Sequence, residues 1–236
     1  MYGVYPERAL CLVKLRTLVM EHYLSDLKKA GLTLSDDGRV CCAWQSVMPD
    51  YHDNEWGRPV TDDRRLFEKV CLEGFHSGMS WQLIYHKRQH FRRAFQDFDF
   101  HTVARFTEAD VERLMNDKTI VRNRAKILSA INNAKRAIEL VSEAGSLGAW
   151  FWQFEPSPQE RPARIDLAYW QSAKTSPEAI RLSKALKKRG WTWVGPVTAY
   201  ALMQALGMIN DHIEGCQCRE VCEAERTNLI RPPLKS

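Results

Sequence analysis

The sequence contains no hydrophobic run that could cross a membrane, because no stretch of about 18 residues is both apolar and free of charge. Near the N-terminus, the apolar stretch from Ala9 to Val13 is interrupted by Lys14 and is too short for the core of a signal peptide. No small-residue cleavage site follows it. We therefore expect a cytoplasmic protein with no membrane partner.

The sequence also lacks the alternation of apolar and polar residues that marks β-strands, and it has no long repeat or low-complexity block. Helical patterns are present instead. An amphipathic helix is expected over residues 7–30, and intervals of three and four residues predict another. The stripe of this second helix consists of Ile127, Ile131, Ala134, Ile138 and Val141. The predicted fold class is all-α.

Further helix starts are indicated by capping residues and by proline at the first helical position. These signals are Thr61-Asp62, Thr107 with Asp110, Ser176-Pro177 and Gly195-Pro196. Gly74 is expected to end the first of these helices, and the segment from residue 147 to residue 176 is too irregular for a long helix.

A length of 236 residues and a hydrophobic content of 44% are ample for one domain with a buried core. The turn-rich segment Leu32–Arg39 predicts a boundary between a helical extension, residues 1–38, and a main domain, residues 39–222. A polar, proline-bearing tail, residues 223–236, is expected to be loose. The net charge of +5 permits nucleic acid as a partner without requiring it.

The seven cysteines do not suggest a disulfide framework, because their number is odd and the chain is neither small nor marked for secretion. Two are adjacent, Cys41 and Cys42, and three lie close to His212 near the C-terminus. One thiolate and one imidazole from each end of the chain would make a Cys2His2 set, the usual composition of a structural zinc site.

His52 is the N-terminal imidazole of this set. It lies in DYHDNEWG (50–57), a stretch with three carboxylates and no aliphatic side chain. It could be a metal ligand, a general base or a loop residue that is hydrogen-bonded to its neighbours. His212 and Cys216 would share one face if their segment were helical. Spacing alone leaves open which cysteine of each pair binds: Cys41 or Cys42, and Cys216 or Cys218.

Six ordered blocks of the sequence resemble the 3-methyladenine DNA glycosylase I family. They are Cys42-x-Trp44, YHDNEWG (51–57), LFEKVCLEG (66–74), SGMSW (77–81), LSKALKKRG (182–190) and NDHIEGC (210–216). The resemblance implies a helical domain of the helix-hairpin-helix glycosylase superfamily, in which a zinc ion joins the N- and C-terminal regions. The implied zinc ligands are Cys42, His52, His212 and Cys216.

The resemblance also implies excision of 3-methyladenine from alkylated double-stranded DNA by a monomeric enzyme, leaving an abasic site. Alkylation at N3 gives the base a positive charge and weakens its glycosidic bond, so base flipping and recognition dominate. The family's catalytic, base-recognising glutamate falls on Glu73 and its stacking aromatics on Tyr51 and Trp81, with Trp44 close to the same pocket. Without the resemblance, Glu73 would be an ordinary solvated residue at a helix end, and these aromatics would be packing residues.

The expected DNA contacts lie in two segments. Met79, beside Gly78, stands where the family usually has leucine and can fill the gap in the duplex as an apolar wedge. After the expected hairpin, Arg122, Arg124 and Lys126 are expected to contact phosphates. A second basic cluster, Lys184, Lys187 and Lys188, is equally well explained as a solvated helix end. No lysine is placed as a Schiff-base nucleophile, so we expect a monofunctional hydrolase.

Three features depart from the family pattern. Thr119 and Ala125 replace the two glycines of the hairpin, where glycine allows a positive φ and a close approach to phosphate. The segment QSVMPD (45–50) is short and lacks an aromatic, and Phe75-His76 places bulk beside Glu73. These departures leave a second hypothesis, a zinc-stapled DNA-binding relative whose excision activity is lost or altered.

Overall fold

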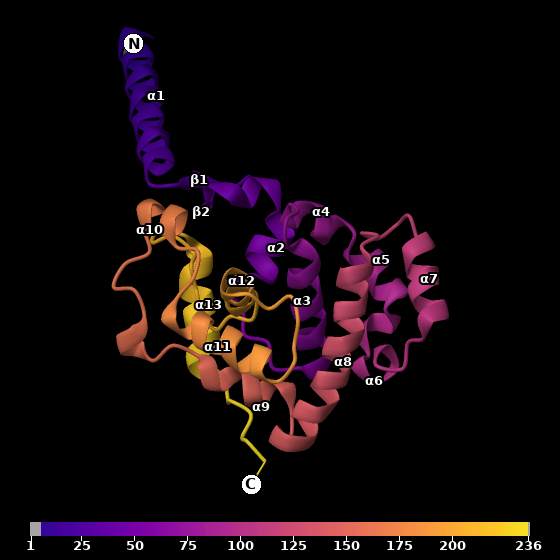
Figure 1. The fold of residues 1–236 in the computed structure, drawn as a ribbon. Coiled ribbons are helices and arrows are strands. Elements are labelled where there is room, and N and C mark those ends of the chain that lie inside the picture. Colours follow the sequence, from indigo (N-terminus) through magenta and orange to yellow (C-terminus); the bar gives the residue numbers. More distant parts are fainter. Residues whose placement is uncertain (1–5, 236) are drawn as a thin grey trace.

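The computed structural model describes residues 6–235, and the side chains of residues 16–235. The α-helices are α1 Pro6–Lys29, α2 Pro49–Asn54, α3 Asp63–His76, α4 Trp81–His86, α5 Arg88–Ala94, α6 Phe100–Val103, α7 Glu108–Asn116, α8 Arg124–Ala144, α9 Leu147–Phe151, α10 Leu167–Ser172, α11 Pro177–Lys188, α12 Pro196–Ala205 and α13 Gln217–Asn228. Short 3-10 helices are η1 Ala43–Val47, η2 Gln96–Phe98, η3 Trp152–Phe154 and η4 Pro158–Glu160. This helical architecture confirms the predicted fold class (Figure 1).

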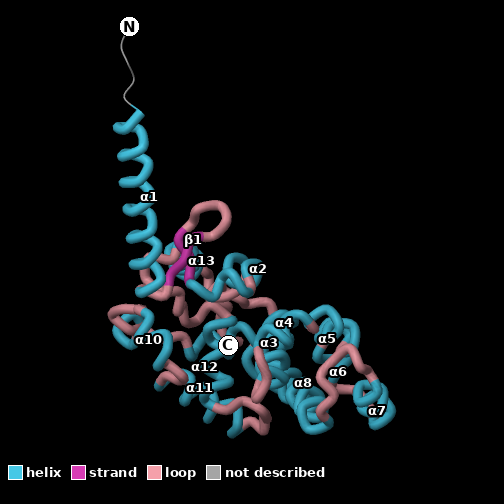
Figure 2. The backbone as a smooth tube through the Cα atoms, turned by 90° about the horizontal axis from the view of Figure 1, so that it is seen from above, coloured by secondary structure: helices cyan, strands magenta, loops and turns pink. Residues whose placement is uncertain are grey.

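Helix α1 stands away from the rest of the molecule in both views (Figures 1 and 2). From residue 16 onward its side chains are exposed apart from the half-buried Leu27, which packs against a small cluster of the main body. Although α1 is 24 residues long, neither it nor any other helix in the described part is apolar enough to cross a membrane. The expected N-terminal helix is thus present, and Leu27 is the one side chain among its described residues 16–29 that packs against the main body.

A β-hairpin follows α1, where no strand was expected. Strands β1 Leu32–Leu34 and β2 Val40–Cys42 pair antiparallel, with Leu32 opposite Cys42. The turn is closed by Ser35, whose hydroxyl bonds with the backbone of Arg39, and by Gly38 at φ 80°. Alternation could not reveal strands of three residues each. The boundary expected between residues 38 and 39 falls inside this turn, between two paired strands. Strand β1 therefore belongs structurally with the main body.

Helix α3 is the centre of the main body, because its residues from Leu66 to Phe75 are all buried. Asp62 caps it by accepting a hydrogen bond from the Arg65 amide, as expected. Gly74 does not end the helix, which continues to His76. Since neighbouring elements cover α3 on all sides, tertiary packing outweighs the helix-breaking preference of one glycine. The buried segment includes the carboxylate of Glu73.

Helices α7 and α8 flank the loop of residues 117–123, and the expected hairpin sequence, Thr119 to Ile127, runs from this loop into α8. The capping box of Thr107 and Asp110 opens α7 as predicted. No residue between 117 and 126 has a positive φ, and the Thr119 amide and hydroxyl both donate to Asp117 Oδ1, at 2.8 and 2.6 Å. Ala125 lies in the first turn of α8. The hairpin therefore forms without either glycine of the family pattern.

The C-terminal segment returns to the start of the main body, where α13 contacts β2. Helix α13 crosses the boundary expected after Cys222, so the expectation of a loose tail is wrong for residues 223–228. Beyond it, Arg231 pairs with Glu155 at 2.9 Å and the Lys235 amide donates to Ala144 O. The predicted starts of α11 and α12 at Ser176-Pro177 and Gly195-Pro196 are confirmed.

Candidate base pocket and metal centre

An aromatic pair and a buried carboxylate from three helices meet at one place. Tyr51 of α2 and Trp81 of α4 have ring centroids 5.3 Å apart. Glu73 of α3 is only 3% exposed, and His76 Nδ1 lies 3.2 Å from Glu73 Oε2. The His76 ring also packs edge-on against Trp81, at 5.5 Å. Three of the residues expected to bind a base are thus brought together, with His76 between two of them.

Trp44 joins this group from the side. Its ring centroid is 6.5 Å from that of Tyr51 and 4.7 Å from that of His52, so it lies between the aromatic pair and the histidine. The Nε1 atoms of Trp44 and Trp81 are buried and have no hydrogen-bond partner in the described part of the chain. Because a buried N–H group without a partner is costly, each of these donors could bond to a ligand or to an ordered water.

Charged residues lie behind Tyr51. Arg88 donates to both carboxylate oxygens of Glu55, at 2.6 and 2.5 Å, and Lys69 Nζ is 4.0 Å from the same carboxylate. Burial lowers the pKa of Lys69 to about 8, although the nearby Glu55 opposes that shift. Burial, followed by the negative charges of Glu73 and Glu55, raises the pKa of Tyr51 well above its ordinary value. The Tyr51 phenol therefore stays neutral and can donate a hydrogen bond.

The pocket is closed in this conformation. The cavity between Tyr51, Trp81 and the charged residues next to them has a volume of about 20 Å³ and is not lined by Glu73, whereas ligand pockets begin at roughly 300 Å³. A base can enter only when side chains move. His76, whose side chain is 34% exposed, and the half-buried Trp81 are more accessible than Tyr51 and Glu73.

The short QSVMPD segment does not leave a hole beside this pocket. It folds into η1 and the start of α2, and Met48 is buried in one cluster with Tyr51 and Trp56. Tyr85 of α4 adds a further ring, 5.2 Å from Tyr51. Met48 and Tyr85 thus both pack around Tyr51.

The loop between α3 and α4 carries Gly78, which is exposed with φ 79°, and the half-buried Met79. Lys126 holds the start of this loop, because its Nζ donates to Phe75 O at 2.8 Å and to Ser77 O at 2.5 Å. Lys126 is only 5% exposed. The expectation that Lys126 contacts phosphate is therefore wrong, since its ammonium group is buried and bound to backbone carbonyls.

The two expected arginine contacts differ from each other. Arg122 is exposed, and no ion pair involves it among the described residues. Arg124 is also exposed but pairs with Glu108 and with Glu112, whose carboxylate lies 2.6 Å from its guanidinium. Arg122 therefore presents a free positive charge, whereas that of Arg124 is neutralised. The cluster Lys184, Lys187 and Lys188 is exposed at the end of α11.

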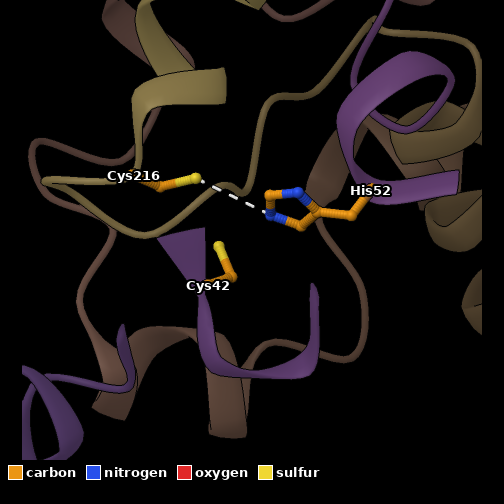
Figure 3. Close-up of side chains that lie close together, drawn as sticks. All are labelled: Cys42, His52 and Cys216. Carbon is orange, nitrogen blue, oxygen red and sulfur yellow. Dashed lines mark hydrogen bonds between the residues drawn. The ribbon is translucent and has the colours of Figure 1, made fainter. Parts of the chain in front are cut away.

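Three of the four predicted metal ligands, Cys42, His52 and Cys216, converge from the two ends of the chain, whereas the ligand atom of His212 groups with those of His52 and Cys218. His52 Nε2 lies 3.6 Å from Cys216 Sγ, with Cys42 beside them (Figure 3). His52 and His212 are fully buried, and their ring centroids are 4.8 Å apart. The segment with His212 and Cys216 is not helical, so the condition for a shared helical face is not met; the chain turns at Gly215, with φ 92°, and both side chains are buried.

Both histidines are oriented as metal ligands usually are. Nδ1 of His52 bonds to Asp53 at 2.7 Å, and Nδ1 of His212 bonds to Asn210 at 2.8 Å. An oxygen partner on Nδ1 directs the Nε2 lone pair inward. His212 Nε2 is buried without any partner in the described part, and burial lowers the pKa of His212 to about 4. His212 is thus neutral, and its Nε2 lone pair is free to bind a zinc ion.

The thiols around these histidines outnumber those a Cys2His2 site needs. Ligand atoms lie within 4.8 Å of one another in three sets: Cys42, His52 and Cys216; His52, His212 and Cys218; and Cys41, His52 and Asp53. Hydrogen bonds from Cys218 and Cys42 depress the pKa of the Cys216 thiol, which favours the thiolate that binds metal. The cysteines between which spacing could not decide, Cys41 or Cys42 and Cys216 or Cys218, therefore all lie at the same centre.

Comparison with known proteins relates this arrangement to one family. The methyladenine glycosylase family model matches residues 41–220. The chain belongs to the methyladenine glycosylase family. A DNA-3-methyladenine glycosylase of Haemophilus influenzae is 38% identical over 75% of this chain and 97% of its own length. DNA-3-methyladenine glycosylase 1 of Escherichia coli is 41% identical over 75% of this chain and 95% of its own.

Solved structures of the methyladenine glycosylase family agree with this fold. A crystal structure of 3-methyladenine DNA glycosylase I has a TM-score of 0.67 at 41% identity, covering 72% of this chain and 93% of its own. A variant in complex with 3-methyladenine has a TM-score of 0.68 at 30% identity, over 72% of this chain and 91% of its own. The extension that contains α1 lies outside the region matched by the family model.

Three residues near the pocket were not predicted from the sequence. His76 was noted only for its bulk, yet it contacts Glu73 and Trp81. Tyr85 follows Trp81 by one helical turn, which could have placed it at the pocket. Trp193 is 38% exposed and has φ 56°, which no sequence pattern indicates.

Proposed function

We propose that this methyladenine glycosylase removes 3-methyladenine from alkylated double-stranded DNA by hydrolysing the bond between the base and C1′ of its deoxyribose. The base leaves with the electron pair of that bond, and water supplies the oxygen that binds C1′ while releasing a proton. The observation that supports this most directly is the buried Glu73 carboxylate beside the aromatic pair Tyr51 and Trp81. It is the arrangement that a flat cation requires.

In this proposal each pocket residue acts on the flipped base. The ring of Trp81 stacks on the purine, and the neutral phenol of Tyr51 faces its edge. Glu73 accepts a hydrogen bond from the exocyclic amine and complements the positive charge of the base. Burial of the carboxylate strengthens this electrostatic attraction. The indole N–H groups of Trp44 and Trp81 can donate to ring nitrogens or to an ordered water. Because N3 alkylation already weakens the glycosidic bond, binding and charge complementarity carry the catalysis.

The duplex is held by the two loops next to the pocket. Met79 enters the gap that the flipped nucleotide leaves, and the exposed Gly78 lets the backbone approach the strand. Arg122 contributes a phosphate contact, and Arg124 does so only after releasing its carboxylate partners. Lys126 supports this loop from behind.

We also propose that one zinc ion joins the two ends of the main body through Cys42, His52, His212 and Cys216. The unpartnered, buried Nε2 of His212 supports this assignment, as do the oxygen partners on Nδ1 of both histidines. When bound, zinc supplies a structural cross-link between segments that lie some 160 residues apart, comparable to a disulfide that closes a long loop. The reaction itself is performed by residues of the base pocket.

The enzyme is proposed to act as a monomer in the cytoplasm. All the pocket and metal residues come from one chain, so no partner subunit is needed to complete the site. The described cysteines are all free, as is common in a reducing compartment. The alternative of an inactive DNA-binding relative depended on the altered hairpin and the short segment, and both fold without the residues that they lack.

The test is release of 3-methyladenine from a methylated duplex by the purified, zinc-loaded chain, followed by chromatography of the free base. Release with first-order kinetics under single-turnover conditions, and strand cleavage only after alkali, is the expected result for a monofunctional enzyme. Absence of release by folded, zinc-loaded protein would contradict the proposed activity, while spontaneous strand cleavage would contradict the absence of a lyase step.

A further inference from the structure

Trp193 lies in the loop between α11 and α12, in a backbone conformation that L-residues rarely adopt. Its φ is 56°, and apart from the turn Gln96–Phe98 it is the one non-glycine residue with a positive φ in the described part of the chain. A bulky side chain in this region costs free energy relative to glycine. Such a residue persists only where its surroundings fix it, and these positions gather at functional sites.

The surroundings fix both neighbours of Trp193. The Thr192 amide donates to Asn133 Oδ1 at 2.9 Å, and Asn133 Nδ2 donates to Thr192 O at 3.0 Å. On the other side, the Ser183 hydroxyl donates to Val194 O at 2.7 Å. Asn133 and Ser183 are buried, at 3% and 1% exposed. Buried polar groups from α8 and α11 thus hold the backbone while the indole between them remains 38% exposed.

The position of the indole relates this loop to the loop that carries the proposed wedge. Lys126 Nζ lies 5.0 Å from the centroid of the Trp193 ring and also donates to Ser77 O, directly before Gly78. A methyl group built on Gly74 would lie 3.6 Å from Trp193 Cβ. The Lys126 ammonium group therefore contacts both the Trp193 ring and the Ser77–Met79 loop. Trp193 also packs beside the turn of α3 that carries Glu73.

We propose that Trp193 is a DNA contact that stacks on an exposed base or sugar of the duplex beside the gap filled by Met79. This inference rests on the proposed function. An exposed aromatic ring offers a flat apolar face that suits any nucleobase, and the ammonium group of Lys126 stabilises the ring from the protein side. The strained conformation directs the indole to the surface. A side chain that only packed in the core would not require this strain.

Substitution by glycine separates this role from a structural one. Trp193→Gly removes the ring and relieves the positive φ, so the thermal midpoint is expected to stay equal or rise. Affinity for a duplex with a central tetrahydrofuran abasic-site analogue is expected to fall about 5- to 100-fold, the range seen when a base-stacking residue is truncated. Trp193→Phe should restore affinity to within about threefold, because phenylalanine keeps a stacking face.

The salt dependence of binding is the second readout. A stacking contact releases no counterions, so the slope of log Kd against log salt concentration should be the same for Trp193→Gly and wild type. The matched control is Tyr23→Ala, which removes a ring of similar exposure (44%) on α1, the helix that stands away from the rest of the molecule (Figure 1), and it should leave Kd unchanged.

Two results would overturn the inference while the wild type still releases 3-methyladenine. One is a Trp193→Gly variant that binds the duplex as tightly as wild type. The other is a variant that loses thermal stability or zinc, since the indole would then be a packing residue. If the wild type neither releases the base nor prefers the abasic duplex, the proposed function fails and this inference fails with it.

Discussion

Glu73 Oε2 and His76 Nδ1 lie 3.2 Å apart on successive turns of α3, and the carboxylate is buried while the imidazole reaches the surface. The histidine therefore fixes one oxygen of Glu73. The other oxygen, Oε1, has no hydrogen bond in the described part of the chain and is available to a base. This pairing makes the orientation of the carboxylate depend on a residue that the family pattern does not usually place there.

Replacing the carboxylate by an amide of the same shape tests its charge. Glu73→Gln is expected to reduce single-turnover release of 3-methyladenine by about 100-fold or more, as removal of one preorganised electrostatic group commonly does. Thermal midpoint and zinc content should be unchanged. Release within a few-fold of wild type would show that the charge of Glu73 is not used.

Replacing the histidine tests its hold on the carboxylate. His76→Leu should lower kcat/KM about 10-fold, because one hydrogen bond worth about 1–1.5 kcal/mol is lost from a buried acceptor. His76→Gln keeps a donor and is expected to remain within about threefold. His86→Gln, at the exposed end of α4, is the control. Equal activity of the leucine and glutamine variants would count against this role.

The roles of the basic residues can be separated by the salt dependence of duplex binding. Arg122→Ala should reduce the slope of log Kd against log salt by about 0.9, the value for one phosphate contact. Lys126→Met should weaken binding without changing the slope, because its ammonium group binds Phe75 O and Ser77 O and supports the loop. A reduced slope for Lys126→Met would restore it as a phosphate contact.

The metal centre is tested by zinc content and by the free energy of unfolding. Cys42→Ser should abolish stoichiometric zinc and destabilise the fold by about 5 kcal/mol, the magnitude of a cross-link that closes a long loop. Cys71→Ala, a buried cysteine of α3, is the control and should keep its zinc. Cys216→Ser should lose zinc and Cys218→Ser should keep it, and the opposite result would exchange their assignments.

Lys69 predicts a dependence of stability on pH. Its pKa is lowered from 10.5 to about 8, so between these values the unfolded chain binds more protons and this group raises stability as pH rises. Below pH 8 the full cost of burying the charge is present. Lys69→Met should therefore be more stable than wild type by on the order of 2 kcal/mol at pH 7, with a smaller difference at pH 10. Denaturant unfolding at both values measures this, and a difference that grows with pH would contradict it.

Local signals predicted local structure correctly. The capping box at Thr107 and Asp110 and the start of α11 at Ser176-Pro177 depend on neighbouring residues alone, and both were confirmed. The family and the fold were predictable from six ordered motifs that span most of the matched region. The convergence of Cys42, His52 and Cys216 followed from composition together with the resemblance.

Features that depend on packing between distant segments were not predictable. Lys126 stands two residues after Arg124, in what reads as a basic surface segment. It is buried because α8 docks against α3. Gly74 reads as a helix end because the sequence does not show that α3 is enclosed. The backbone on either side of Trp193 is held by Asn133, some 60 residues earlier in the chain, and by Ser183. Each depends on partners that periodicity cannot identify.

Helix α2 has only six residues and carries Tyr51 and His52 side by side, one toward the base pocket and the other toward the metal centre. So short an element has no stability of its own and takes its position from what binds at each side. Any factor by which the proposed zinc ion tightened binding of the damaged base would equal the factor by which the base tightened binding of zinc. Zinc supply would then set lesion affinity as well as the amount of folded enzyme.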